Sequence, residues 1–191
     1  MSESRLFTAY QNHSEALEQS LAINAGRIES YAKTLAESFA SGQRLLIVAS
    51  GSLAGVSTTL ANAFLYRLEM ERPCLPVVAL NPPDGLAMLL SVNDDIEQIF
   101  SCQLQAQASE ADHVLFLAGS ASAALINVHK TAIDIGCTTA VICIGDEASW
   151  KKENPGLLVP LMAPSSARGI EAALFFGHML CELVEAELFG F

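Results

Sequence analysis

Short apolar runs that alternate with helix-like stretches constrain the fold of this chain more than any other feature of its sequence. From Arg44 onward, each run has the length of a buried strand, and the stretches between runs have helical spacing. The expected strands are 45–49, 77–80, 114–118, 140–144 and the shorter 157–161, and the expected helices are 55–70, 84–90, 95–108 and 121–135. This order is typical of an α/β domain with a doubly wound parallel sheet.

A long apolar stripe precedes the alternating region. Its steps of four and seven residues indicate one amphipathic helix, or two helices in series with a break at Gly26. The stripe consists of Leu6, Tyr10, Leu17, Leu21, Ile28, Leu35 and Phe39. We expect this segment, residues 1–41, to pack between subunits, ahead of an α/β core over 44–191 in the same single domain. A final helix over 167–188 is expected, with Ser165 or Ser166 as its cap.

Composition and charge limit the partners that this chain can bind. The 191 residues are 51% hydrophobic and 16% charged, which excludes a disordered chain and fits one domain. The ten Lys and Arg residues are scattered and the net charge is −11, so direct nucleic-acid binding is not expected. Neither a signal peptide nor a membrane span is predicted. Five cysteines without a pairing pattern are interpreted as reduced core residues of a cytoplasmic protein.

Two turns rich in small residues follow the first and third expected strands and open helices. The first contains Ser50, Gly51 and Ser52, and the second contains Ser120 and Ser122. Backbone N–H groups and hydroxyls in such turns can hold an anion at the positive end of a helix dipole. Open parallel sheets bind ligands outside the carboxyl ends of their strands. The turns therefore suggest a pocket for a phosphomonoester; the alternative is that each is a strand-to-helix turn whose small residues serve packing.

A more specific signal lies in the stretch from Tyr66 to Asn81, which reads YRLEMERPCLPVVALN. This stretch resembles the phosphoheptose isomerase and DiaA branch of the sugar isomerase (SIS) domain family, and its spacing from the first strand is similar. Further similar positions are Asn93, Asp94, Asp112, Ser166, Ala167, Arg168, Glu171, Glu187, Leu188 and Phe189. The resemblance therefore covers nearly the whole chain.

The resemblance implies a three-layer α/β/α sandwich with a five-stranded parallel sheet. It also implies a homotetramer assembled through the long helices, with phosphosugar sites near the subunit boundaries. For this chain we expect no cofactor. The family's phosphate turns map onto Ser50, Gly51 and Ser52 and, after a deletion of one residue, onto Ser120 and Ser122.

The catalytic positions of the family depart from its pattern in this chain. Phosphoheptose isomerases use a histidine and a glutamate on the helix after the first strand, and a glutamine and a histidine on the last helix. The first pair aligns here with Thr59 and Ala63, and the glutamine aligns with Ile170, so that only His178 remains. We expect no metal site, because zinc requires three or four protein ligands. Glu171 joins His178 as the candidate acid or base.

Three functions fit this pattern. The first is a catalytically inactive phosphosugar-binding protein of the DiaA type, which acts as a homotetrameric adaptor for a replication initiator protein. The alternative is a phosphoheptose isomerase that acts on sedoheptulose 7-phosphate. A third is a phosphosugar sensor without an initiator partner.

The other histidines are expected to be structural. His13 lies on the first helix within reach of a neighbouring subunit, His113 begins a strand, and His129 lies on a surface helix. Asp146 and Glu147 are expected in a solvated turn after the fourth strand.

Overall fold

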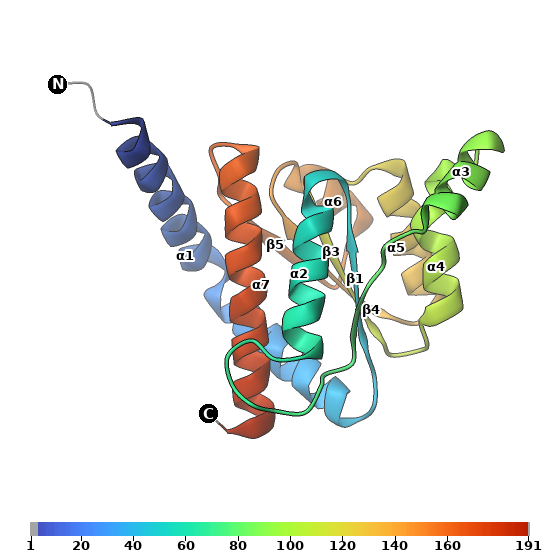
Figure 1. Ribbon diagram of the computed structural model, residues 1–191, viewed down its shortest axis with the longest axis horizontal. Helices are drawn as coiled ribbons and strands as arrows, with labels where there is room; N and C mark the ends of the chain where they lie inside the picture. Colours follow the sequence, from blue (N-terminus) through green and yellow to red (C-terminus); the bar gives the residue numbers. More distant parts are fainter. Residues whose placement is uncertain (1–3, 191) are drawn as a thin grey trace.

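The computed structural model describes residues 4–190, and its sheet of five parallel strands confirms the expected α/β fold class. The strands are β1 (Leu45–Ala49), β2 (Val77–Ala79), β3 (His113–Ala118), β4 (Thr138–Cys143) and β5 (Leu157–Pro160). They lie in the order β2-β1-β3-β4-β5 (Figure 1). The chain therefore moves outward from β1 to β2, and then returns to place β3 on the other side of β1.

Helices cover both faces of the sheet and give the molecule the three expected layers (Figure 1). On one face lie α1 (Arg5–Ala40), α2 (Ala54–Leu65) and α7 (Ser166–Phe189), and on the other lie α4 (Ile99–Gln107), α5 (Ala123–Ile135) and α6 (Glu147–Glu153). The short α3 (Asp84–Val92) lies beyond α4 and buries none of its residues. Every residue of β1 and β3 is buried, as central parallel strands covered on both faces require.

The N-terminal segment forms one continuous helix, and Gly26 does not interrupt it. Its middle turns seal the edge strand β5 with side-chain hydrogen bonds. The buried Asn24 amide donates to the Pro160 carbonyl at 2.7 Å, Arg27 donates to the Leu158 carbonyl at 3.1 Å, and the Met162 N–H donates to the Ser20 hydroxyl at 2.8 Å. Since an unpaired strand edge invites another strand, α1 protects the sheet as well as covering one face.

The last helix packs closely on α2. It begins where predicted, with the Ser165 hydroxyl accepting a hydrogen bond from the Arg168 N–H at 3.4 Å. At Gly177 the two helices are so close that a Cβ atom would collide with the Leu60 side chain. Among residues 4–190, no helix combines the length and apolarity needed to cross a membrane.

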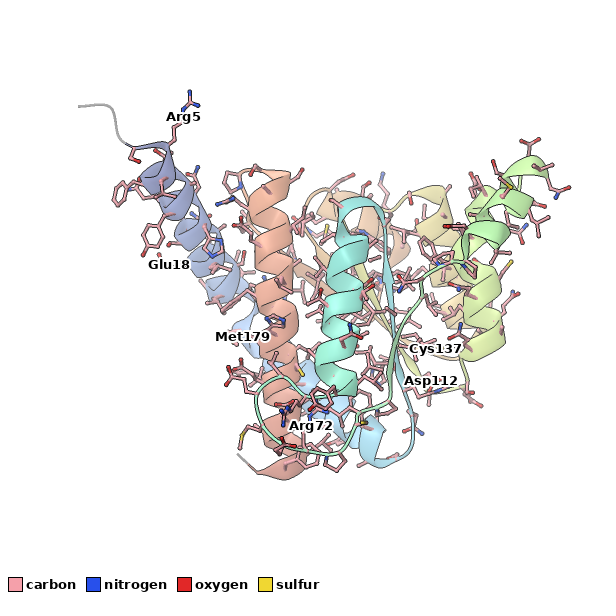
Figure 2. All side chains as sticks on the ribbon, in the orientation of Figure 1. Arg5, Glu18, Arg72, Asp112, Cys137 and Met179 are labelled. Atoms are coloured by element: carbon pink, nitrogen blue, oxygen red, sulfur yellow. The ribbon has the colours of Figure 1, made fainter. Side chains whose placement is uncertain are left out.

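Two predicted helix properties were wrong, and tertiary contacts explain both. The helix after β1 ends at Leu65 instead of residue 70, because the buried Arg72 guanidinium donates to the carbonyls of Ala63 and Phe64 at its C-terminus. Figure 2 shows Arg72 at the foot of α7. His129 lies on α5 but is buried against Phe116 and Trp150, not exposed.

Two smaller expectations also need correction. The turn after β4 leads into an unpredicted helix, α6, whose first N–H groups at Ala148 and Ser149 are capped by the Asp146 carboxylate. All five cysteines are free, as expected, but only Cys143 and Cys181 are buried and Cys74 is exposed. Burial raises the pKa of the Cys181 thiol to about 12, so this cysteine is unreactive.

Candidate functional site

The two serine-bearing turns meet at the point where the strand order of the sheet reverses. β1 and β3 are hydrogen-bonded neighbours, and their last paired residues are Ala49 and Leu117. After β1 the chain enters α2 on one face, whereas after β3 it enters α5 on the opposite face. In sheets of this order, that divergence opens the crevice in which ligands bind.

The first turn places two serines and a helix N-terminus at the end of β1. Gly51 has φ = 58°, a conformation that favours glycine, and starts a short 3-10 helix that continues into α2. Ser52 is exposed and Ser50 is half-buried. Neither hydroxyl makes a side-chain hydrogen bond among the described residues, so both are free to donate to a bound oxygen.

The second turn is braced from behind by the segment after β4. The Ala121 N–H donates to the Ser149 hydroxyl at 2.9 Å, and the Asp146 N–H donates to the Gly119 carbonyl at 2.6 Å. A Cβ atom on Gly145 would lie only 2.8 Å from that same carbonyl oxygen, so glycine is required for this approach. Sequence reasoning missed this bracing, because the serine involved lies 28 residues from the turn that it supports.

The exposed Ser120 and Ser122 are the free donors of the second turn. Ser122 precedes α5 as its N-cap residue but makes no side-chain capping bond, and its N–H donates to the Ser120 carbonyl at 3.1 Å. The structure thus brings all five predicted phosphosugar-binding positions to adjacent strand ends. An anion there would meet two helix N-termini and several hydroxyls without a lysine or arginine in either turn.

The two catalytic candidates on α7 are not brought together. Glu171 and His178 are seven residues apart, which corresponds to about 10 Å along a helix. Both carboxylate oxygens of Glu171 are engaged, one by His13 Nδ1 at 2.7 Å and the other by Arg168 Nη2 at 2.5 Å. His13 therefore contacts α7 of its own chain. His178 is half-buried and has no side-chain hydrogen bond among the described residues.

Two positions on α2 align, by resemblance, with the family's histidine and glutamate. In this chain their side chains cannot act as an acid or a base. Thr59 is exposed, and its hydroxyl donates to the Gly55 carbonyl of its own helix at 3.0 Å. The side chain of Ala63 is a methyl group, and its carbonyl accepts from Arg72 at 2.9 Å. Within residues 4–190 there is no group of three or more His, Cys, Asp and Glu side chains that could hold a metal ion.

A doubly wound parallel sheet with small-residue turns at its switch point is the arrangement expected of a sugar isomerase (SIS) domain protein. No protein-family model matches the chain. A curated relative, the phosphoheptose isomerase of Trichlorobacter lovleyi, is 31% identical over 185 residues, which cover 94% of this chain and 92% of the relative. The chain therefore belongs to the phosphoheptose isomerase family of SIS-domain proteins.

Solved structures agree with the fold. A phosphoheptose isomerase from Francisella tularensis superposes with a TM-score of 0.85 at 20% identity, covering 96% of this chain and 98% of that one. The Vibrio vulnificus NanR protein, solved in complex with ManNAc-6P, matches with a TM-score of 0.66 at 7% identity, covering 96% of this chain and 63% of that one. At these identities the likeness concerns the fold.

Proposed function

We propose that this chain binds a phosphorylated sugar with its phosphate in the cradle formed by Ser50, Gly51, Ser52, Ser120 and Ser122. The observation that carries the proposal is the pair of turns at the switch point, where four serine side chains have no side-chain partner. Family membership supports it, because the relatives are named for a phosphorylated sugar. The expected cytoplasmic location suits such a ligand.

The relatives' names favour isomerisation over the adaptor role as the activity at this site. The candidate substrate is sedoheptulose 7-phosphate. An aldose–ketose isomerase moves a proton between adjacent carbons, so a positioned acid or base is needed. His178 is the candidate for that role because its ring has no side-chain hydrogen bond among the described residues. Glu171 is held by His13 and Arg168, so it would act on substrate only after leaving these partners.

A second candidate function is binding without turnover, as in a sensor or adaptor. The observation that favours it is the replacement of the acid, base and glutamine positions by Thr59, Ala63 and Ile170. A single free histidine does not replace a paired acid and base, whereas phosphate binding needs neither. This candidate function has the same ligand and the same serine cradle, and differs only in that the bound sugar is not isomerised.

Two measurements on the purified chain test both candidates. Sedoheptulose 7-phosphate should raise the melting temperature, and Ser52→Ala and Ser120→Ala should each weaken this stabilisation. Ser91→Ala, an exposed serine on α3, is the matched control and should bind as the unchanged chain does. Turnover that is lost in His178→Ala would establish the isomerase. Stabilisation without turnover would establish the binding protein, and no stabilisation would contradict the proposal.

The homotetramer is also a proposal. The first turns of α1 diverge from α7 (Figure 1), and the Leu6, Phe7 and Tyr10 side chains are at least half exposed. Pairing of such stripes between copies would bury them. Sedimentation of the full chain should give the mass of four copies. A replication initiator partner stays a prediction, to be tested by binding of the purified initiator to this chain.

A further inference from the structure

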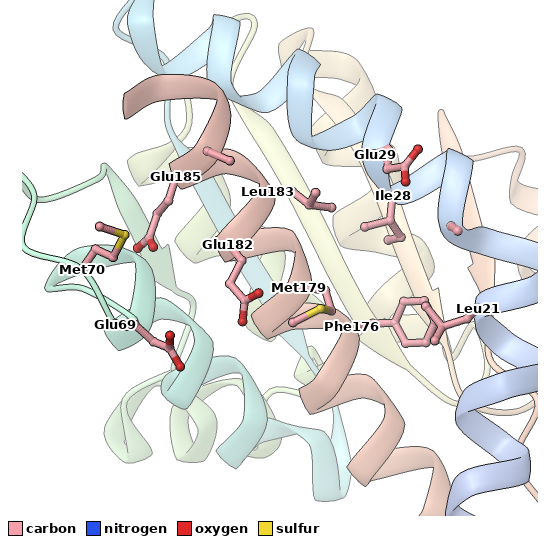
Figure 3. Close-up of a pocket in the computed structure, with 12 residues that line it drawn as sticks. Leu21, Ile28, Glu29, Glu69, Met70, Phe176, Met179, Glu182, Leu183 and Glu185 are labelled. Atoms are coloured by element: carbon pink, nitrogen blue, oxygen red, sulfur yellow. The ribbon is translucent and has the colours of Figure 1, made fainter. Parts of the chain in front are cut away.

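The apolar groove between α1 and α7 and the short helix α6 both lie outside the serine cradle and the candidate acid–base positions. The groove is lined by Leu21, Ile28, Phe176 and Met179, among others (Figure 3). It lies on the long helices through which the proposed tetramer would assemble, so another copy of the chain would cover it. The helix α6 is different, because it lies directly behind the second serine turn and contacts it.

The Ser149 hydroxyl is the contact between α6 and this turn. It accepts a hydrogen bond from the Ala121 N–H at 2.9 Å and donates its own proton to the Asp146 carbonyl at 2.7 Å. Because the hydroxyl proton is used on the Asp146 side, a lone pair of the same oxygen is available to Ala121. Ala121 lies between Ser120 and Ser122, so this hydrogen bond fixes the backbone from which both candidate phosphate donors project.

The residue after Ser149 anchors α6 to the elements on either side of the turn. Trp150 is fully buried, and its ring centroid lies 5.4 Å from that of Phe116 in β3 and 6.0 Å from that of His129 in α5. The strand β3 leads into the turn, and α5 leads out of it. Close packing of buried aromatic rings holds their elements in place. Ser149 is therefore kept at a defined position behind the turn.

The acidic side chains at the start of α6 are engaged by partners of their own. The Asp146 carboxylate accepts from the Ala148 N–H at 3.1 Å and the Ser149 N–H at 3.3 Å, and the Glu147 carboxylate lies 3.0 Å from the Lys151 ammonium. A carboxylate without such partners would repel a bound phosphate. Since both charges are compensated, α6 can support an anion site from behind.

The turn itself contributes little to its own order. Ser122 makes no side-chain capping bond among the described residues, and the turn's own hydrogen bond joins the Ser122 N–H to the Ser120 carbonyl at 3.1 Å. A loop that is ordered before its ligand arrives binds more tightly, because less entropy is lost on binding. We propose that Ser149 is a positioning residue of the phosphosugar site, which holds the second turn in its ligand-binding shape. This inference rests on the proposed phosphosugar binding and adds a residue that acts through Ala121.

Calorimetric titration of the full chain with sedoheptulose 7-phosphate tests the proposal. Ser149→Ala should raise the Kd about fivefold to tenfold, which is the order of effect that one hydrogen bond contributes. Ser149→Thr keeps the hydroxyl and should restore the affinity. Ser41→Ala is the matched control. It removes a hydroxyl that donates to the Glu37 carbonyl at 2.9 Å, at the opposite edge of the sheet, and should leave the Kd unchanged.

Amide hydrogen exchange tests the same contact without a ligand. The Ala121 N–H should exchange about tenfold faster in Ser149→Ala than in the unchanged chain or in Ser149→Thr, while the amides of β3 keep their protection. Equal exchange of Ala121 in all three chains would overturn the proposal. Loss of protection across β3 in Ser149→Ala would overturn it as well, because Ser149 would then support the fold and not the site.

The titration also separates this inference from the function on which it rests. If the unchanged chain binds the sugar phosphate and Ser149→Ala binds it equally well, the positioning role is wrong and the proposed function stands. Tighter binding by Ser149→Ala would show that Ser149 competes with the ligand for the Ala121 N–H, which also contradicts the positioning role. If the unchanged chain does not bind, the proposed function fails, and the positioning role fails with it.

Discussion

Two glutamates of α7 each meet an arginine, but in different surroundings. Glu171, near the start of the helix, is 38% exposed and pairs with Arg168 and His13. Glu185, near the end, is 5% exposed and pairs with an Arg72 side chain that is 1% exposed. Exposed ion pairs contribute little to stability, whereas a buried charge without its partner is strongly unfavourable. The two ends of one helix therefore differ in how freely their residues can be exchanged.

The two ends of α7 also lie in different parts of the molecule. The N-terminal end of α7 follows β5 at the same edge of the sheet as the serine turns, and its polar contacts are accessible to water. The C-terminal end of α7 packs with the end of α2 and the segment around Arg72 in one buried cluster. Substitution near the start of α7 should therefore cost little stability, whereas substitution in the buried cluster should cost much more.

The largest effect is expected for Arg72→Met, which leaves the Glu185 carboxylate buried without a cation. It also removes donors from the last carbonyls of α2. We expect the free energy of unfolding, measured in urea, to fall by about 3–5 kcal/mol. Arg67→Met, which removes a pair between Arg67 and the exposed Glu71, should change it by less than about 1 kcal/mol. If Arg72→Met/Glu185→Leu were no more stable than Arg72→Met alone, the buried charge would not be the cause.

The next effect concerns the buried amide that seals the sheet. Asn24→Ala leaves the Pro160 carbonyl without its donor, and we expect a loss of about 1–3 kcal/mol in the same urea measurement. Arg27→Ala removes a hydrogen bond to the same strand from an exposed side chain and should have a smaller effect. Equal losses for the two variants would show that the loss of stability does not depend on whether the donor side chain is buried.

Stability should also depend on pH, through two histidines that are buried outside α7. Burial lowers the pKa of His113 and His129, and nearby Asp112 and Glu153 offset this lowering only in part. Both rings are thus neutral in the folded chain at a pH where the unfolded chain, with a histidine pKa of about 6.5, begins to bind protons. Stability is then fully present above about pH 6.5 and falls as the pH drops toward the folded pKa values.

Urea unfolding between pH 7.5 and pH 5 measures this slope. His129→Leu removes one of the two groups and should flatten the slope, whereas Lys130→Ala, at the exposed neighbouring position, should not. An unchanged slope in His129→Leu would show that another group is responsible for the acid sensitivity.

The smallest effect is expected at the exposed end of α7. Glu171→Gln weakens the contacts with His13 and Arg168, which are both accessible to water, and should lower the free energy of unfolding by at most about 1 kcal/mol. A loss as large as that of Arg72→Met would erase the distinction between the two ends. If the chain is an active isomerase, the same variant should strongly reduce turnover while it changes the free energy of unfolding little.

The sequence predicts the elements that depend on local pattern, and tertiary contacts determine the rest. The strand 45–49 is found with its predicted bounds, because an apolar run lies between Arg44 and Ser50. By contrast, α2 ends before its predicted bound because Arg72, which lies beyond the helix, binds its last carbonyls. The helix α6 was not predicted because it is too short and polar to have an apolar stripe. The burial of His129 depends on aromatic residues from β3 and α6, which no local pattern reports.

The candidate site was predictable to a similar degree. The two turns are found at adjacent strand ends because parallel strands end at the same edge, and the small residues of both turns are visible in the sequence. The hydrogen bond from Ala121 to Ser149 and the close approach of Gly145 depend on the packing of β4 beside β3. The separation of Glu171 and His178 follows from helix geometry, but the capture of Glu171 by His13 required the position of α1.

The helix that seals β5 also determines what happens to a shortened chain. Without residues 1–41 the carbonyls of Leu158 and Pro160 would lose their donors, and a strand edge would face water. Such an edge can pair with further strands, so a fragment that lacks α1 should aggregate. The long helix thus protects the chain against polymerisation, a role separate from any contact between folded copies.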